Sequence, residues 1–309
     1  MDWTHRLRLR HLRALLSVAE TGNLSQSAAI LNTTQPALSK WLKELEADIG
    51  LPLFDRHARG LRPTAYGDAL IEHARRIEAH LDGARDDMLA LRDGGSGVVA
   101  IGASGVASSN TVPLAVSRLL QNAPLVQVRL VESTMNMLLP QLVRGELDIV
   151  VGRTTPEGMD AQIDAEILYS EPIDFVCRQG HPLTGPSALD WEDLLAYQWI
   201  VWPPGTPVRT ALEATLAAAG QTMPKACVES NSAIVNITLL NHTDLLGVAS
   251  HRGALRFERM NALTVLPVRL TGSGSVSMYW RRDNLNRAAV AAALDCLRAS
   301  AEADAGEAG

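Results

Sequence analysis

The sequence predicts a chain of three parts: an N-terminal winged helix-turn-helix, a long linker helix, and a C-terminal region of α/β fold. Three observations predict this arrangement. Over residues 24–64, two short helical segments joined by a tight polar turn precede a small basic hairpin. An apolar heptad stripe then runs through residues 64–92. Beyond residue 97, strand patterns alternate with helix patterns, which is typical of α/β proteins with mainly parallel sheets.

The helix-turn-helix can be followed residue by residue. Asn23 begins its first helix, and Gln26 three residues later gives the spacing of a capping box. Thr34 is placed to cap the second helix, and Pro36 lies in its first turn, where a missing N–H costs little. Four apolar residues of the second helix recur at helical spacing and are expected to face inward: Leu38, Leu42, Leu45 and Ile49. Another helix is predicted upstream, over residues 9–21, with four residues facing inward: Leu9, Leu12, Leu16 and Ala19.

The outward faces of the second helix carry hydrogen-bonding side chains. In a major groove Gln can pair with adenine, Ser with the edges of either strand, and Lys with guanine or phosphate. An ordinary amphipathic helix with a solvated face has the same pattern, so the helix alone does not separate the two interpretations. The residues that we expect to bind DNA on and before this helix are Thr33, Thr34, Gln35, Pro36, Ser39, Lys40 and Lys43.

Two short strands are predicted after this helix, over residues 53–56 and 60–64, with a basic tip between them. Arg56 and Arg59 lie in this tip. A wing of this kind enters the minor groove beside the recognition helix. The alternative is a surface turn whose arginines are only solvated.

The charge distribution favours DNA binding by the N-terminal segment, although the whole chain has a net charge of −6. Residues 1–62 carry nine Lys and Arg against six Asp and Glu, whereas residues 94–309 carry fifteen against twenty-one. Positive charge is therefore concentrated in the segment that would contact phosphate.

Other features of the composition indicate a soluble, cytoplasmic protein. No stretch approaches the ~20 apolar residues of a membrane span, and the N-terminal segment lacks the apolar region of a signal peptide. Cys177, Cys227 and Cys296 are isolated and show no spacing for a zinc site or a disulfide framework. We expect no metal site and no cofactor beyond a small-molecule effector.

Several motifs resemble the N-terminal segment of LysR-type transcriptional regulators. They occur in order and without gaps over residues 7–64: Leu9-Arg-His-Leu, Gly22-Asn-Leu-Ser, Ala28-Ala, Gln35-Pro-Ala-Leu-Ser, Leu45-Glu, Gly50-Leu-Pro-Leu-Phe-Asp-Arg and Leu61-Arg-Pro-Thr-Ala-Tyr-Gly. The resemblance implies an effector-responsive regulator that binds double-stranded promoter DNA, contacts RNA polymerase and forms dimers or tetramers. It also implies two Rossmann-like (periplasmic-binding-protein-like) effector subdomains. The domain boundaries that we predict are 7–64 for the DNA-binding domain, 64–92 for the linker helix, and 95–303 for the effector domain, with subdomain one at 95–167 and 268–303 and subdomain two at 168–267.

The long helix after Thr64 carries an apolar stripe with alternating spacings of four and three: Leu70, Ala74, Ile77, Leu81, Ala84, Met88 and Leu91. Such a heptad seam, with charged residues on the other faces, predicts pairing with a second copy of the chain. A helix packed within its own domain is the alternative. Asp93 begins a glycine-rich segment that is expected to be a flexible linker, and the last residues, 301–309, are expected to form a frayed tail.

Polar residues at strand ends predict an effector site, because ligands of α/β sheets bind at the carboxyl ends of strands and at helix N-termini. Ser104 and Thr134 follow the first two strands, Arg153 follows the third, and Trp202 and Thr206 precede a helix of subdomain two. Hydroxyl groups beside exposed backbone N–H groups favour a small organic anion such as a carboxylate. For each hydroxyl alone, a helix-capping role is the more common explanation. Met135, Met137 and Trp202 are expected to line an apolar part of the site.

An enzyme is not expected, because the sequence has no nucleophile elbow, P-loop or metal-ligand spacing, and its eight histidines are scattered. A solute-binding transport protein would share the C-terminal fold, but it would need a secretory signal and no helix-turn-helix. The sequence does not identify the effector, the target genes or the direction of regulation.

Overall fold

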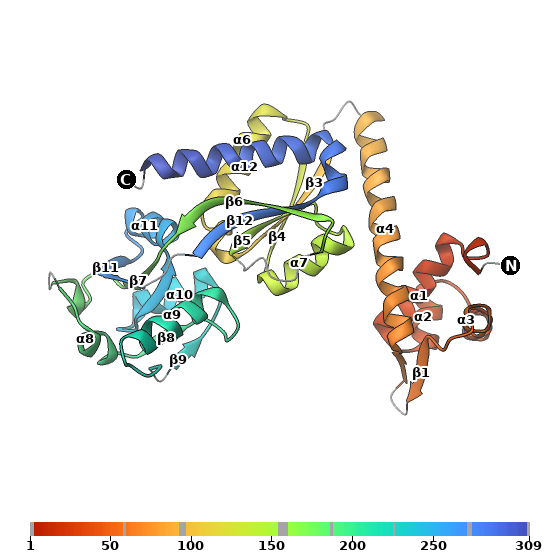
Figure 1. The fold of residues 1–309 in the computed structure, drawn as a ribbon, viewed down its shortest axis with the longest axis horizontal. Helices are drawn as coiled ribbons and strands as arrows, with labels where there is room; N and C mark the ends of the chain where they lie inside the picture. The colour runs from red at the N-terminus through yellow and green to blue at the C-terminus, as the bar shows by residue number, and fades with distance from the viewer. Residues whose placement is uncertain are drawn as a thin grey trace. The chain divides into compact units, whose positions relative to one another are not determined.

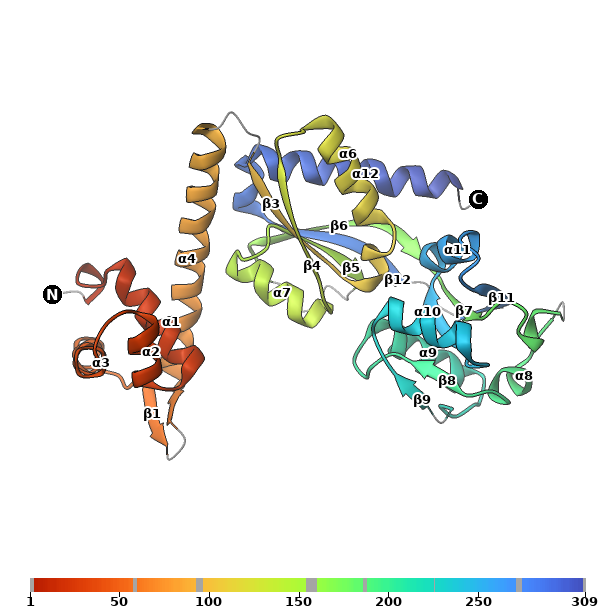
Figure 2. The ribbon, with the colours of Figure 1, turned by 180° about the vertical axis from the view of Figure 1, so that it is seen from behind.

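The structure is a computed structural model that describes residues 3–57, 60–92, 97–153, 160–185, 188–224, 226–270 and 274–307 (Figures 1 and 2). The chain divides into two compact units. The first comprises Met1–Leu89 with Arg144–Glu146, and the second comprises Ala90–Val143 with Leu147–Gly309. None of the helices in the described part of the chain combines the length and apolar composition that a membrane span requires.

The first unit contains the predicted winged helix-turn-helix and the long helix (Figure 1). Its elements are a 3-10 turn at Trp3–His5, α1 (Leu9–Thr21), α2 (Leu24–Ile30), α3 (Gln35–Ile49), β1 (Phe54–His57), β2 (Gly60–Pro63) and α4 (Ala65–Arg92). One apolar core joins the three short helices, the hairpin and the start of α4. Leu38, Leu42 and Leu45 of α3 are buried in it as predicted, whereas Ile49 is only half-buried.

Two predictions about the first unit are wrong in detail. Leu9 lies outside the core with 51% of its surface exposed, because α1 packs instead through Leu12, Leu15 and Val18. The Asn23 side chain does cap α2, where it accepts from the amides of the second and third helical residues at 2.9 and 3.2 Å. The expected return bond from Gln26 is replaced, since the Asn23 amide donates to the Thr21 hydroxyl at 3.1 Å.

Glu46 fixes the wing to the recognition helix. Its carboxylate oxygen Oε1 accepts from the backbone amides of Leu53 and Phe54 at 2.8 and 3.1 Å. These amides open the strand β1, which pairs antiparallel with β2. Thr64 ends the hairpin and caps α4, because its hydroxyl accepts from the Gly67 amide at 3.1 Å. The hairpin therefore has a fixed direction relative to α3.

The second unit contains two lobes, each built on its own sheet. Lobe one has a five-stranded sheet in the order β4-β3-β5-β12-β6. Its elements are β3 (Val98–Ala103), α5 (Gly105–Ser108), α6 (Thr111–Asn122), β4 (Gln127–Glu132), α7 (Met135–Arg144), β5 (Ile149–Arg153), β6 (Ile163–Glu171), β12 (Gly274–Arg281), a 3-10 turn at Arg282–Asn286, and α12 (Ala288–Glu307). Helices α6 and α12 cover one face of the sheet and α7 covers the other (Figure 1).

Lobe two is built on β7 (Ile173–Cys177), whose neighbours are β10 (Gly247–Ser250) and β11 (Thr264–Arg269). A parallel pair, β8 (Trp199–Val201) and β9 (Ala226–Glu229), continues the sheet through a bridge from Trp199 to Leu246. The remaining elements are a 3-10 turn at Pro182–Thr184, α8 (Trp191–Leu195), α9 (Pro207–Ala218), α10 (Ala233–His242) and α11 (His251–Arg259). Phe175 and Trp199 meet edge to face at 5.3 Å in its core.

The prediction of mainly parallel sheets is wrong. In the described part of lobe one, only β3, β4 and β5 form a parallel group, because β12 runs antiparallel to both β5 and β6. In lobe two, β7 is antiparallel to both of its neighbours. The chain passes from lobe one to lobe two at Pro172, between β6 and β7, and returns between β11 and β12. Helix α12 extends to Glu307, so the tail that was expected to be frayed is helical to that residue.

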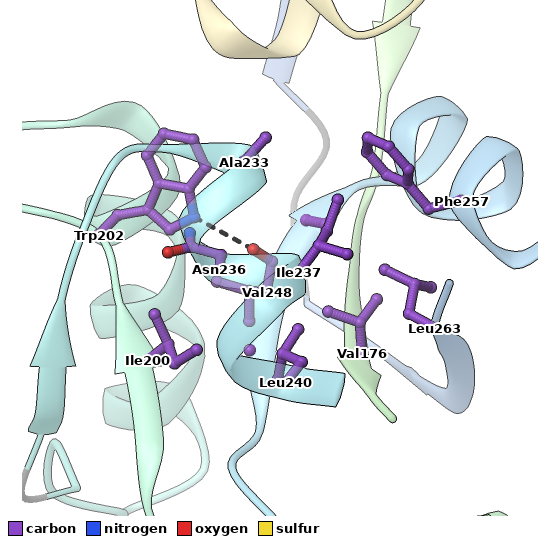
Figure 3. Close-up of a pocket in the computed structure, with 12 residues that line it drawn as sticks. Val176, Ile200, Trp202, Ala233, Asn236, Ile237, Leu240, Val248, Phe257 and Leu263 are labelled. Atoms are coloured by element: carbon purple, nitrogen blue, oxygen red, sulfur yellow. Dashed lines mark hydrogen bonds between the residues drawn. The ribbon is translucent and has the colours of Figure 1, made fainter. Parts of the chain in front are cut away.

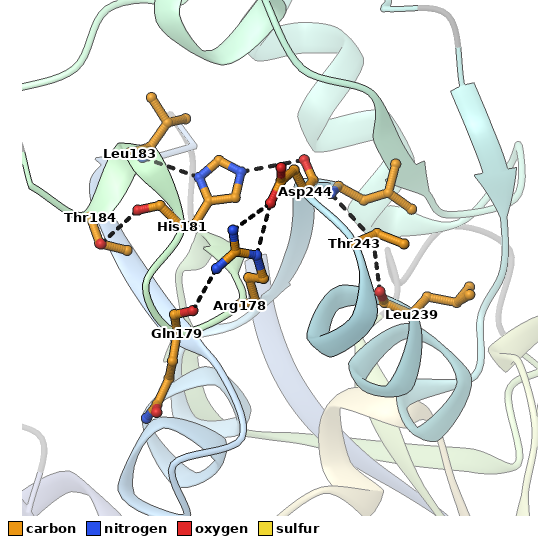
Figure 4. A network of polar contacts seen from close by, with 9 residues as sticks. Arg178, Gln179, His181, Leu183, Thr184, Leu239, Thr243 and Asp244 are labelled. Atoms are coloured by element: carbon orange, nitrogen blue, oxygen red, sulfur yellow. Dashed lines mark hydrogen bonds and ion pairs between the residues drawn. The ribbon is translucent and has the colours of Figure 1, made fainter.

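A polar network closes the end of β7 (Figure 4). Arg178 binds the carboxylate of Asp244 at 2.7 Å. The buried His181 ring accepts from the Leu183 amide at 3.1 Å through Nδ1, and its Nε2 lies 3.3 Å from the Asp244 carbonyl. These contacts fix the loop before β10, which leads to the cavity described below.

We predict that Glu46→Ala lowers the stability of the DNA-binding domain by about 1–3 kcal/mol, because two partly buried amides lose their acceptor. Urea unfolding of the full chain, together with amide exchange of residues 51–57, measures this effect. The variant Glu46→Gln keeps a carbonyl oxygen and should lose less. Equal behaviour of the Glu46→Ala variant and the wild-type protein in both assays would show that the carboxylate does not fix the wing.

Candidate functional site

The expected DNA-binding residues of the helix-turn-helix form one surface. Thr33, Thr34, Gln35, Pro36, Lys40 and Lys43 are exposed and Ser39 is half-buried. They lie away from the buried side of α3, and Thr34 also caps the helix, with its hydroxyl 3.4 Å from the Ala37 amide. The nearest acidic partner of Lys40 is Glu44 at 3.8 Å, and both side chains are well exposed. Such a pair is weak and leaves the ammonium group available for phosphate.

The hairpin contributes further cations to the first unit. Arg56 is exposed on β1, whereas Arg59 lies outside the described residues. Arg62 on β2 is a further exposed cation that the sequence analysis did not select. It faces Asp55 in the strand register, and this alternation of charges along a short hairpin is the signal that was missed.

A cavity of about 700 Å³ lies between the two lobes of the second unit. All five expected effector residues line it: Ser104, Thr134, Arg153, Trp202 and Thr206. The structure therefore brings together side chains from three strand ends of lobe one and one loop of lobe two. Met135 and Trp202 line the cavity as expected. Met137 does not, because it lies on the other side of α7 with 57% of its surface exposed.

The lobe-one wall presents an unpaired hydroxyl group. Ser104 follows β3, and its Oγ is buried with no hydrogen-bond partner among the described residues. Gly152 lies opposite on β5, where a Cβ atom would overlap Ser104 Oγ and Met135 Sδ. Thr134 precedes α7, and its carbonyl accepts from the amides of Met137 and Leu138, the third and fourth residues of the helix. This wall therefore combines a free hydroxyl with a helix start, a combination that suits an anionic oxygen.

Arg153 is the buried cation of the cavity, with 7% of its surface exposed. One guanidinium nitrogen, Nη2, donates to the Glu171 carbonyl, while Nε has no hydrogen-bond partner among the described residues. Burial lowers the pKa of this guanidinium, and the nearby Glu171 carboxylate opposes that effect. Arg153 therefore has an acidic neighbour, Glu171, and also an unused donor, Nε.

The lobe-two wall is more apolar, and its hydroxyl is already in use. Thr206 Oγ1 donates to the Pro203 carbonyl at 2.8 Å and accepts from the Arg209 amide at 3.4 Å. Trp202 Nε1 donates to the Val248 carbonyl at 3.1 Å, which holds the indole ring against the cavity. For Thr206, helix capping accounts for the bond from Arg209, and the turn before the helix accounts for the bond to Pro203.

Arg256 is a cavity residue that the sequence analysis missed. It lies on α11, and its guanidinium donates to the Ser109 carbonyl in lobe one. Among the described residues, those with a charge that line the cavity are Arg153, Arg256 and one carboxylate, Glu132. The repeated Arg residues of the segment 251–259 were the available signal, but their pattern is also that of a solvated helix face.

Metal binding and thiol chemistry find little support in the described part of the chain. It contains no cluster of three or more His, Cys, Asp or Glu side chains that could hold a metal ion. Cys177 and Cys296 are buried free thiols. Burial raises the pKa of Cys177 to about 12, so this thiol stays protonated at neutral pH and is a poor nucleophile.

Two known sequence families together match nearly the whole chain. Residues 9–68 match "Bacterial regulatory helix-turn-helix protein, lysR family", and residues 92–302 match "LysR substrate binding domain". The chain belongs to the LysR family. It is a DNA-binding transcriptional regulator with a substrate-binding domain, and it is not an enzyme.

Two curated relatives are similar over almost the full length. The regulator GbpR of Azospirillum brasilense is 32% identical over 300 residues, which cover 96% of this chain and 87% of the relative. The regulator PcaQ of Agrobacterium fabrum is 30% identical over 298 residues, with 96% of each protein covered. Among solved structures, full-length CbnR complexed with its target DNA has a TM-score of 0.69 at 21% identity and covers 95% of this chain and 100% of CbnR. This structural likeness confirms the predicted fold class.

Proposed function

We propose that this regulator reads promoter DNA with helix α3 and the wing, and that a small organic anion bound between the lobes controls it. One observation supports the proposal that an effector binds here. A single cavity is lined by the unpaired hydroxyl of Ser104 and by Arg153, a buried cation with an unused donor. Buried polar atoms without partners are rare in proteins, and a ligand that satisfies them gains binding free energy. Contact with RNA polymerase stays a prediction of the family resemblance.

The anionic character of the effector is supported by the charges of the cavity. Two of the three charged residues that line it in the described part of the chain are arginines, and the guanidinium of each donates to a backbone carbonyl. The start of α7 at Thr134 adds the positive end of a helix dipole. A carboxylate at this place would accept from Ser104 and Arg153.

For DNA recognition, we predict that Gln35→Ala or Ser39→Ala weakens binding to the operator by ~1–3 kcal/mol per lost base contact and leaves non-specific binding unchanged. Gel shifts or fluorescence anisotropy on operator and random DNA measure the two affinities. Equal weakening on both DNAs would show that these side chains do not read bases.

Lys40→Ala and Arg56→Ala serve as matched controls. They should weaken binding to every sequence and reduce the salt dependence of log K by about one unit per phosphate contact.

Dimerisation through α4 is supported by the exposure of its apolar stripe. Ala74 is buried in the first unit, so the beginning of the predicted seam packs within its own chain. Farther along, Ile77, Leu81 and Met88 have 41, 39 and 62% of their surface exposed. We propose that a second copy covers this part of the stripe, because a row of exposed large apolar residues at heptad spacing favours helix pairing.

We predict that Leu81→Asp reduces the assembly size in sedimentation and weakens operator binding, because it buries a charge in the proposed seam. The matched control is Gly83→Asp, which adds the same charge two residues away, where the space around the glycine is open. If Leu81→Asp leaves the assembly size at the wild-type value, the stripe does not pair the chains.

For effector control, we predict that Ser104→Val and Thr134→Val bind operator DNA normally but respond to the effector at least about tenfold more weakly. Each variant removes a hydrogen bond to a charged group, worth about 1.5–3 kcal/mol. A promoter assay measures the response, and a gel shift controls for folding. A normal effector response in both variants would place the effector site elsewhere.

A further inference from the structure

A second cavity, here called the side pocket, lies within lobe two under helix α10 (Figure 3). Its walls come from α10, β7, β8, β10 and α11, and its lining is almost entirely apolar. Four residues line both the side pocket and the main cavity: Trp202, Ala233, Ala249 and Phe257. The two cavities are therefore neighbours that share one wall of small and aromatic side chains.

The size of the side pocket limits what can enter it. Its volume is about 50 Å³, whereas an apolar cavity of roughly 150 Å³ is known to hold benzene. A whole aromatic ring is therefore too large, and an alkyl arm of about two or three carbons is of suitable size. Asn236 Oδ1 is the one side-chain acceptor there that is buried without a hydrogen-bond partner among the described residues. Water is a poor occupant, because a buried water needs several polar partners and not one.

We infer that the side pocket is a selectivity subsite for the effector, and that the effector is a carboxylate with a short alkyl arm. The inference rests on the proposed effector function of the main cavity. The carboxylate lies against Ser104 and Arg153 in lobe one, and the body of the ligand lies along Trp202 and Phe257. The alkyl arm enters the side pocket toward Ile237 and Leu240.

Gly247 provides a way to fill the side pocket without disturbing the main cavity. It lines only the side pocket, and a Cβ atom there would touch Leu240 and Val176 at 3.5 Å, an ordinary van der Waals distance. Gly247→Ala therefore removes pocket volume without a clash. Gly185→Ala is the matched control in the same lobe, because its φ is −85° and its surroundings are open.

The experiment measures the dissociation constants of benzoate, 4-ethylbenzoate and gluconate for the full-length protein by calorimetry. A buried methylene contributes ~0.8 kcal/mol, so the ethyl arm should tighten binding about tenfold over benzoate. Gly247→Ala should remove most of this gain and leave benzoate binding unchanged, while Gly185→Ala keeps the gain.

Four results would overturn the inference. If 4-ethylbenzoate binds no tighter than benzoate, or if Gly247→Ala leaves the gain intact, the side pocket is only a packing void. Binding of gluconate alone would reject the alkyl arm and leave the anionic effector site standing. If none of the three anions binds, the subsite inference is rejected. If Ser104→Val also leaves the promoter response normal, the proposed effector function fails together with the subsite.

Discussion

The buried carboxylate of Glu171 holds together the region where the two lobes meet. Glu171 ends β6 immediately before the chain enters lobe two, and only 1% of its surface is exposed. Its Oε1 accepts from the Arg252 amide at 2.9 Å, and its Oε2 lies 3.3 Å from Arg252 Nε at the start of α11. Burial raises the pKa of this carboxyl, and the two arginines, Arg252 and Arg153, oppose the shift. A charge so deeply buried is tolerated only with such partners, so the partners constrain where α11 can lie.

Two glycines create the space that the cavity and this ion cluster need. At Gly274 on β12, a Cβ atom would meet the Arg153 side chain at 2.7 Å, so glycine lets Arg153 lie flat against the strand. At Gly152, glycine leaves room for Ser104 and Met135 on the lobe-one wall. Both strands are central in the sheet, where a side chain would normally contribute packing. The polar wall of the cavity thus depends on missing side chains as much as on Ser104 and Arg153 themselves.

The sequence predicted those features that depend on local chemistry. Thr34 caps its helix as expected, and Ser104, Thr134 and Arg153 meet because parallel strands bring their carboxyl ends to one edge of a sheet. Features that depend on distant pairing were missed. The strand β6 is recognisable only through its partner β12, which lies more than 100 residues later. Likewise Arg256 reads as a solvated cation until α11 is placed against lobe one.

The proposed effector can act only if it binds one arrangement of the lobes more tightly than another. In the present arrangement, α11 of lobe two contacts lobe one through Arg252 at Glu171 and through Arg256 at the Ser109 carbonyl. Arg256 also lines the cavity, so an anion there would compete for the guanidinium that now holds Ser109. An anion could also bind Arg153, whose guanidinium donates to the Glu171 carbonyl while its Nε has no partner among the described residues. A ligand that draws on both arginines would therefore change the contacts on each side of the lobe boundary, and this gives it the differential affinity that a switch requires.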